Sequence, residues 1–156
     1  MHIKKYQSYT VLEATKDRIK KVFDDFEKVY VSFSGGKDST VMIHLVMEEA
    51  IKRGKQVGVL IIDLEAQYKD TIDHIERTVE MYKDHIDLHW FAEPLLLRNA
   101  VSNYAPRWIC WDEEKKDIWV RPKPLKARPV TDYPFFVPKM EFEELIAIYE
   151  SNRFDV

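Results

Sequence analysis

Residues 29–40 of the chain read VYVSFSGGKDST. The first five residues are β-branched or aromatic apart from one serine, which is typical of a short strand. The glycine pair predicts a tight turn, and the residues beyond it predict the start of a helix. A tight turn alone needs neither a lysine nor an aspartate at its exit. Lys37 and Asp38 therefore indicate that this turn binds something.

Strand and helix patterns alternate further along the chain. Residues 56–62 and 86–90 are rich in apolar residues and predict two more strands, while residues 69–84 carry apolar side chains at helical spacing. Residues 41–46 are apolar almost all round, which predicts a buried helix that ends near Gly54. The pattern favours right-handed βαβ units and an α/β fold: a doubly wound, Rossmann-like parallel sheet flanked by helices.

The flanking segments are less regular. Thr10 and Glu13 have the spacing of a capping box, which predicts a first amphipathic helix. A short helix is expected over residues 95–101, and a final helix from about residue 141 to 149. Between them, the Trp- and Pro-rich segment 104–138 is expected to be irregular.

Composition narrows the class of protein. The 156 residues, 46% of them hydrophobic, predict a single domain over residues 1–156. A net charge of -3 does not by itself indicate nucleic acid or an anionic membrane. One cysteine, Cys110, excludes an intramolecular disulfide framework and any metal site that needs several cysteines from this chain. The N-terminus MHIKKYQSYT lacks the apolar region of a signal peptide, so we expect a cytoplasmic protein without a membrane segment.

The glycine turn has the chemistry of a phosphate site. In a parallel α/β sheet, ligands bind beyond the carboxyl ends of the strands, where this turn falls. Glycines allow backbone N–H groups to converge on an anion, and the following helix adds the positive end of its dipole. Ser34 and Ser39 add hydroxyl donors, Lys37 adds a cation, and Asp38 can hold magnesium or orient the lysine. The P-loop pattern does not fit, because it needs glycine at Val31 and Ser or Thr where the chain has aspartate.

The stretch SGGKDS, residues 34–39, resembles the PP-loop of the adenine nucleotide alpha hydrolase superfamily, the N-type ATP pyrophosphatases, and is nearest to its phosphoadenosine phosphosulfate (PAPS) reductase-like branch. Members bind an adenine nucleotide, most often ATP, and many cleave between the α- and β-phosphates to adenylate a substrate. The resemblance implies that magnesium is held by Asp38 and Asp63, and that Lys37 and Asp38 act in catalysis. The residues expected to contact the nucleotide are Ser32, Phe33, Ser34, Gly35, Gly36, Lys37, Asp38, Ser39, Asp63, Tyr68, Arg121 and Lys123.

A narrower resemblance extends over residues 62–68, 99–102, 111–112 and 119–123. These segments are similar to a PAPS reductase-like subfamily that includes the immunoglobulin-binding regulator type of transcriptional coactivator, which is encoded beside a ParB-like partner. Such relatives are longer, so the chain is expected to be a short form or an N-terminal piece. The resemblance leaves two functions open: an ATP pyrophosphatase that adenylates an unknown acceptor, or a catalytically silent nucleotide-binding regulatory subunit or coactivator with a ParB-like partner.

The resemblance does not imply reductase activity. A thiol-dependent sulfonucleotide reductase carries a nucleophilic cysteine in a C-terminal Glu-Cys-Gly-type motif, which this chain lacks. Cys110 lies between tryptophans and is expected to be a packed, inert thiol.

Charge is unevenly distributed. Residues 115–128 hold six basic side chains and one acid, whereas residues 61–87 hold eight acids and three basic groups. The basic segment is either a solvated loop or a site where Arg121 and Lys123, stiffened by flanking prolines, bind the nucleotide phosphates or a nucleic-acid backbone. Trp119 lies within this segment and Trp111 lies just before it. Each tryptophan either stacks on a base or packs internally.

Other candidate groups carry weaker signals. Asp63 and Glu65 follow a predicted strand, where either could reach magnesium or simply form the acidic entry to a helix. Tyr68 is placed to line the adenine. The sequence spacing of the histidines matches no recognised metal site. We therefore interpret His74, His85 and His89 as surface or packed residues.

Overall fold

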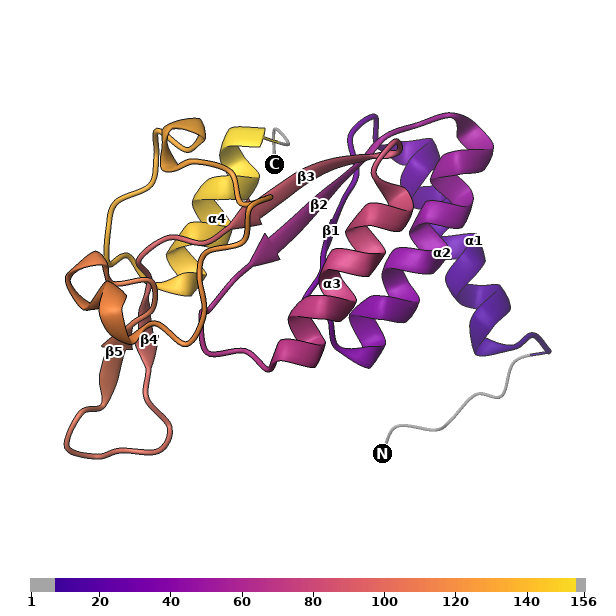
Figure 1. The fold of residues 1–156 in the computed structure, drawn as a ribbon. Coiled ribbons are helices and arrows are strands. Elements are labelled where there is room, and N and C mark those ends of the chain that lie inside the picture. Colours follow the sequence, from indigo (N-terminus) through magenta and orange to yellow (C-terminus); the bar gives the residue numbers. More distant parts are fainter. Residues whose placement is uncertain (1–7, 154–156) are drawn as a thin grey trace, which may run out of the picture.

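The computed structural model describes residues 8–153, so the expectation drawn from the N-terminal sequence rests largely on residues outside this range. Figure 1 shows the arrangement of the elements. They are α1 (Val11–Asp25), β1 (Tyr30–Ser32), α2 (Lys37–Arg53), β2 (Val57–Ile62), α3 (Lys69–Tyr82), β3 (Ile86–Phe91), β4 (Leu96–Arg98), β5 (Arg107–Ile109), the 3-10 helices η1 (Glu113–Ile118) and η2 (Val130–Asp132), and α4 (Phe142–Arg153).

The first three strands form a parallel sheet in the order β1-β2-β3. Val31 of β1 pairs with Val59 of β2, which in turn pairs with Leu88 of β3. Helices α1, α2 and α3 lie on one side of this sheet and α4 lies on the other (Figure 1). The predicted α/β fold with a parallel sheet flanked by helices is confirmed. Within the described residues, no helix is both long and apolar enough to span a bilayer.

Side chains alternate between the two faces of the parallel sheet, and the hydrophobic core therefore has two parts. Val57, Val59 and Ile61 of β2 are buried against α1, α2 and α3, whereas Leu60 faces a second cluster built from α4 and the irregular C-terminal part. Successive strand side chains point to opposite faces, so a strand that is apolar in nearly every position must be covered on both. The VGVLII sequence of β2 therefore requires both layers.

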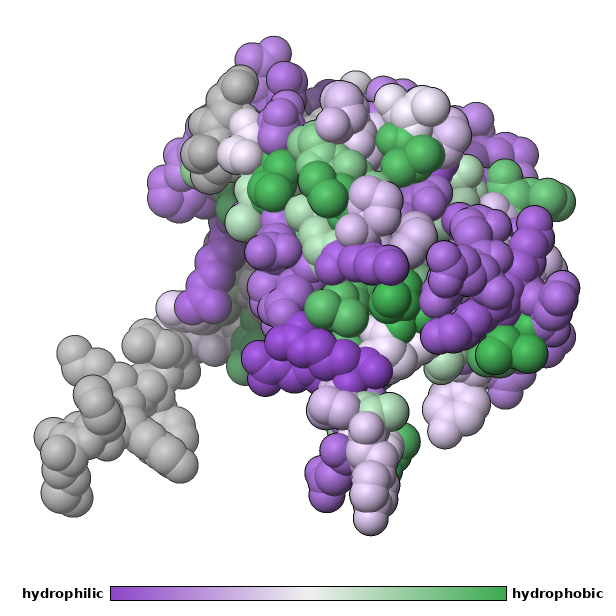
Figure 2. Space-filling view, turned by 90° about the vertical axis from the view of Figure 1, so that its left-hand side faces the viewer, coloured by the Kyte–Doolittle hydropathy of each residue, from purple (hydrophilic) through white to green (hydrophobic). Residues whose placement is uncertain are grey.

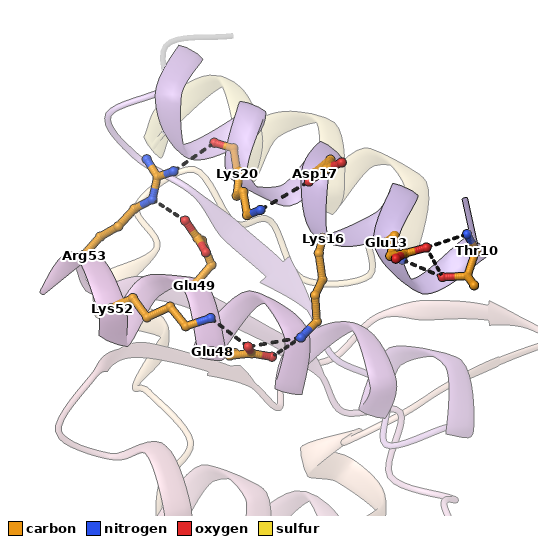
Figure 3. Close-up of polar contacts among 9 residues, drawn as sticks. All are labelled: Thr10, Glu13, Lys16, Asp17, Lys20, Glu48, Glu49, Lys52 and Arg53. Atoms are coloured by element: carbon orange, nitrogen blue, oxygen red, sulfur yellow. Dashed lines mark hydrogen bonds and ion pairs between the residues drawn. The ribbon is translucent and has the colours of Figure 1, made fainter. Parts of the chain in front are cut away.

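Helices α1 and α2 are tied together by polar contacts as well as by packing (Figure 3). The predicted capping box of α1 is present, with the Thr10 side chain accepting from the backbone N–H of Glu13. Lys16 of α1 forms an ion pair with Glu48 of α2 at 2.9 Å. Helix α2 ends as predicted at Gly54, whose φ of 63° is left-handed. These contacts hold α2 in place, and the SGGKDS motif leads into its first turn.

Two sequence predictions about local structure are wrong. Residues 95–101 do not form a helix: Leu96–Arg98 is β4, which pairs antiparallel with Arg107–Ile109. The apolar start of α2 is not buried all round either, because Val41 and Met42 are 59% and 43% exposed. The turn that joins β4 to β5 projects from the body of the molecule, and both views show it (Figures 1 and 2).

Candidate functional site

The SGGKDS motif, which we call the PP-loop, connects the end of β1 to the first turn of α2. Gly35 has a φ of +74°, a conformation that side chains rarely adopt. A Cβ atom there would also lie 2.9 Å from Thr71 Cγ2 on α3. Gly36 has an ordinary φ of -75°, and a Cβ atom would meet only Ser34 Oγ at 3.5 Å. The turn therefore requires glycine at Gly35, because α3 is packed against it.

The first turn of α2 leaves backbone donors available for a ligand. Gly36 is its N-cap, and no side chain caps the helix. Ser34 Oγ and Ser39 Oγ lie 3.1 Å apart, and the Ser39 hydroxyl is 3.0 Å from the Gly36 carbonyl. Both serines therefore border the uncapped N–H groups. Free N–H groups, hydroxyls and the helix dipole together form an anion site.

The charged pair of the loop is at the surface. Lys37 Nζ donates to Asp38 Oδ1 at 2.7 Å, and both side chains are 89% exposed. Such an exposed ion pair contributes little to stability, so either group can turn to a ligand at small cost. Tyr68, the residue predicted to line the adenine, precedes α3 and is 87% exposed.

The two residues just before the turn differ in the exposure of their side chains. Phe33 is buried in the α-helical side of the core, and its N–H donates to Leu60 O at 2.8 Å. Its side chain therefore points away from any ligand at the surface. Ser32 is exposed and lines a pocket of about 440 Å³ between α1, β1 and α2.

Asp63 holds an internal network at the end of β2. Its side chain is fully buried and accepts from the Glu65 N–H at 2.9 Å and from Trp90 Nε1 at 3.0 Å. It also forms an ion pair with Arg121, whose guanidinium stacks over the Trp111 ring at 5.0 Å. Both oxygens of this carboxylate are therefore already taken by N–H donors.

Glu65, like Asp63, accepts hydrogen bonds inside the protein. It is 6% exposed and accepts from the Trp111 N–H at 2.7 Å and the Val120 N–H at 3.3 Å. Within residues 8–153, no three His, Cys, Asp or Glu side chains gather closely enough to hold a metal ion. Of the predicted magnesium ligands, the exposed Asp38 fits a cation shared with phosphates, whereas Asp63 as arranged does not.

The two tryptophan candidates pack against each other, and the half-buried Trp119 also lines a pocket with Arg121 and Lys123. Trp111 is fully buried, and its Nε1 donates to Asp63 O at 2.7 Å. Trp119 packs edge-on against Trp111 with ring centroids 5.1 Å apart. Cys110 is fully buried, and burial raises the pKa of its thiol to about 11. The thiol is therefore packed and protonated, as the sequence predicts.

The basic segment 115–128 is matched by acids of the same chain. Lys123 lies 3.3 Å from both Glu93 and Glu113. Three further ion pairs reach into the acidic segment 61–87: Arg121 with Asp63, Lys126 with Glu80, and Arg128 with Asp87. The two oppositely charged segments therefore neutralise each other, a relationship that sequence analysis missed. Binding of nucleic acid by this segment stays a prediction.

Helix α3 lies between the PP-loop and the basic segment. Its residues Thr71 and Ile75 contact the loop at Gly35. Residues Asp73 and Glu76 project from the opposite side of the helix, where they line a pocket of about 430 Å³ together with residues 120–125. Arg121 and Lys123 belong to the stretch that lines this pocket, and their contact with the nucleotide stays a prediction.

His74, which sequence analysis interpreted as a surface or packed residue, lies behind the PP-loop. His74 Nε2 on α3 is 2.8 Å from Thr40 Oγ1, the residue that follows the motif. Thr40 Oγ1 is also 2.8 Å from the Gly36 carbonyl. The 34 residues that separate His74 from Thr40 leave no local signal of this contact.

Comparison with known proteins agrees with this geometry. The family model of the phosphoadenosine phosphosulfate reductase domain matches residues 28–127, which include the PP-loop, the sheet and most of the basic segment. The chain is 42% identical over 140 residues to "Uncharacterized protein YbdN" of Escherichia coli (strain K12). That alignment covers 87% of this chain and 34% of the relative, so the chain spans about a third of its length. No solved structure matches.

Proposed function

The chain belongs to the phosphoadenosine phosphosulfate reductase domain family, and on that premise we propose that it binds ATP or a related adenine nucleotide together with magnesium. The observation that carries the proposal is the uncapped start of α2, reached through a turn at which only glycine fits. That combination leaves N–H groups and a helix dipole for an anion.

Different groups of the PP-loop bind the phosphates and the magnesium ion. Backbone N–H groups at the start of α2 donate to the phosphates, and Ser34 and Ser39 add hydroxyl donors beside them. Lys37 leaves its contact with Asp38 and pairs with a phosphate, because an ion pair so exposed is easily exchanged. Asp38 is the residue that holds magnesium, a cation often bound by one or two carboxylates plus phosphate oxygens.

We propose cleavage of the α–β phosphoanhydride as the reaction. An acceptor forms a bond to the α-phosphorus while the bond to the bridging oxygen breaks, and pyrophosphate leaves with that electron pair. Lys37 and the loop N–H groups stabilise the charge that develops on the leaving group. Magnesium, when bound with the nucleotide, neutralises further phosphate charge. No nucleophile from this chain is required, and the acceptor is a separate molecule.

One observation favours a second function, that of a catalytically silent nucleotide-binding subunit or coactivator that works with a ParB-like partner. Asp63, the second predicted magnesium ligand, and Glu65, the other candidate, are buried and accept N–H donors of the same chain. A site in which Asp38 is exposed but Asp63 and Glu65 are buried can bind a nucleotide without cleaving it.

ATP labelled at its α-phosphorus separates the two functions. The enzyme releases labelled AMP or an adenylated acceptor with pyrophosphate, and it needs magnesium; the regulatory subunit binds ATP and returns it intact. Labelled ADP would indicate cleavage between the β- and γ-phosphates and would contradict the proposed reaction. Absence of any ATP binding would contradict both functions. Lys37→Ala serves as the control for cleavage by a contaminant.

A further inference from the structure

The structure assigns the protonation of His74. Thr40 Oγ1 lies 2.8 Å from the Gly36 carbonyl oxygen and 2.8 Å from His74 Nε2. A threonine hydroxyl has one proton, and a carbonyl oxygen can only accept. Two acceptor atoms 2.8 Å apart repel when no proton lies between them, so both contacts are hydrogen bonds only when the hydroxyl proton points to Gly36 and His74 donates. It follows that Nε2 of His74 carries a proton.

This chain of hydrogen bonds fixes one peptide unit of the PP-loop. The Gly36 carbonyl accepts from the Thr40 hydroxyl, from the Ser39 hydroxyl at 3.0 Å and from the Thr40 N–H at 2.9 Å, and the first of these bonds is the one that His74 orients. Because a trans peptide is planar, its C=O and N–H point in opposite directions. Holding the Gly36 carbonyl toward the helix therefore turns the Lys37 N–H outward, to where an anion would lie.

We propose that His74 is a positioning residue for the PP-loop, acting through Thr40 on the Gly36–Lys37 peptide. It touches no phosphate itself. The effect on nucleotide affinity rests on the proposed function, whereas the assigned tautomer does not. His74 also packs edge-on against Phe33, with ring centroids 6.0 Å apart, which holds its ring in place behind the loop.

The first test needs no nucleotide. Nitrogen chemical shifts of the neutral His74 ring, measured by NMR on the whole chain, should show a proton on Nε2 and none on Nδ1. A proton on Nδ1 alone would overturn the proposal, because Thr40 would then donate to His74 and its hydroxyl would no longer hold the Gly36 carbonyl. This result stands even if the protein binds no ATP, which would contradict the proposed function alone.

The second test measures affinity for magnesium-ATP. We expect Thr40→Val and His74→Phe each to weaken binding about 2- to 10-fold, the effect of losing one hydrogen bond. The double variant should lose no more than either single variant, because both changes break the same chain. His74→Gln should restore most of the affinity, since its amide can donate from nearly the same place.

The same helix pair offers a matched control. His44 lies on α2 one helical turn after Thr40, and its Nδ1 is 2.6 Å from Tyr82 OH on α3. His44→Phe removes a comparable contact between the two helices and should leave ATP affinity unchanged. Equal losses from His44→Phe and His74→Phe, or losses from Thr40→Val and His74→Phe that multiply in the double variant, would overturn the proposal.

Discussion

Gly35 and Ile75 approach each other so closely that a Cβ atom on residue 35 would lie 2.8 Å from Ile75 Cγ1. Real Cβ atoms essentially never show so short a distance. Ile75 is itself fully buried in the core between the sheet and its helices. The shape of the PP-loop turn is therefore set by the packing of α3 as well as by the motif.

The two loop glycines should differ sharply on substitution. Gly35→Ala combines a left-handed φ with a steric clash, and we expect it to lower the free energy of unfolding by about 1–3 kcal/mol. At Gly36 the φ is ordinary and an added Cβ atom would make only a van der Waals contact, so we expect Gly36→Ala to change the free energy of unfolding by less than about 1 kcal/mol. Urea denaturation of both variants measures the difference. Equal destabilisation would show that α3 does not restrict the turn.

The buried ion pair should be a structural element. Arg121→Ala leaves the carboxylate of Asp63 buried without its cation, and we expect a loss of about 3–5 kcal/mol in the free energy of unfolding. Lys126→Ala removes a half-exposed pair with Glu80 from the same segment and should cost less than about 1 kcal/mol. Denaturant titration of both variants tests this. If Arg121→Ala is as stable as the wild type but binds ATP less tightly, Arg121 faces the nucleotide instead.

Cys110 should be unreactive while the protein is folded. Its pKa is raised to about 11 by burial, so a thiol reagent at neutral pH should modify it only after denaturation. The folded state then holds the thiol proton more tightly than the unfolded state, so stability should fall as pH rises from about 9 toward about 11. This part of the pH dependence should disappear in Cys110→Ala.

An enzyme assay and a binding assay check the assignment of Cys110 as a packed, unreactive thiol. Thioredoxin and PAPS should yield no sulfite with the wild-type chain, and Cys110→Ala should bind ATP as the wild type does. Rapid labelling of the native thiol, or sulfite formation that the substitution abolishes, would contradict the assignment of a packed cysteine.

Local sequence patterns predicted much of the fold. Period-2 and period-3.6 patterns gave the three parallel strands and α1 to α3, and the capping box and Gly54 marked helix ends. The β4 strand was predicted as a helix because its identity depends on pairing with Arg107–Ile109, and residues 95–101 alone do not encode that partner. Exposure of Val41 and Met42 likewise depends on which neighbours cover α2.

The sequence predicted only the part of the candidate site whose residues are adjacent in the chain. The PP-loop could be identified because its residues adjoin in sequence. The contacts that support it join residues far apart: 34 residues separate Thr40 from His74, and 58 separate Asp63 from Arg121. Composition showed the acidic and basic segments but not that they pair, because pairing depends on the path of the chain around α3.

The central claim is that the PP-loop binds the phosphates of an adenine nucleotide, and calorimetric titration of magnesium-ATP into wild type and Lys37→Ala tests it most directly. We expect the variant, whose lost side chain is 89% exposed, to stay folded and to bind about 1–3 kcal/mol more weakly, the effect of losing a charged hydrogen-bond partner. Lys52→Ala, at the far end of the same helix, should bind as the wild type does. Equal affinity in wild type and folded Lys37→Ala would contradict the assignment.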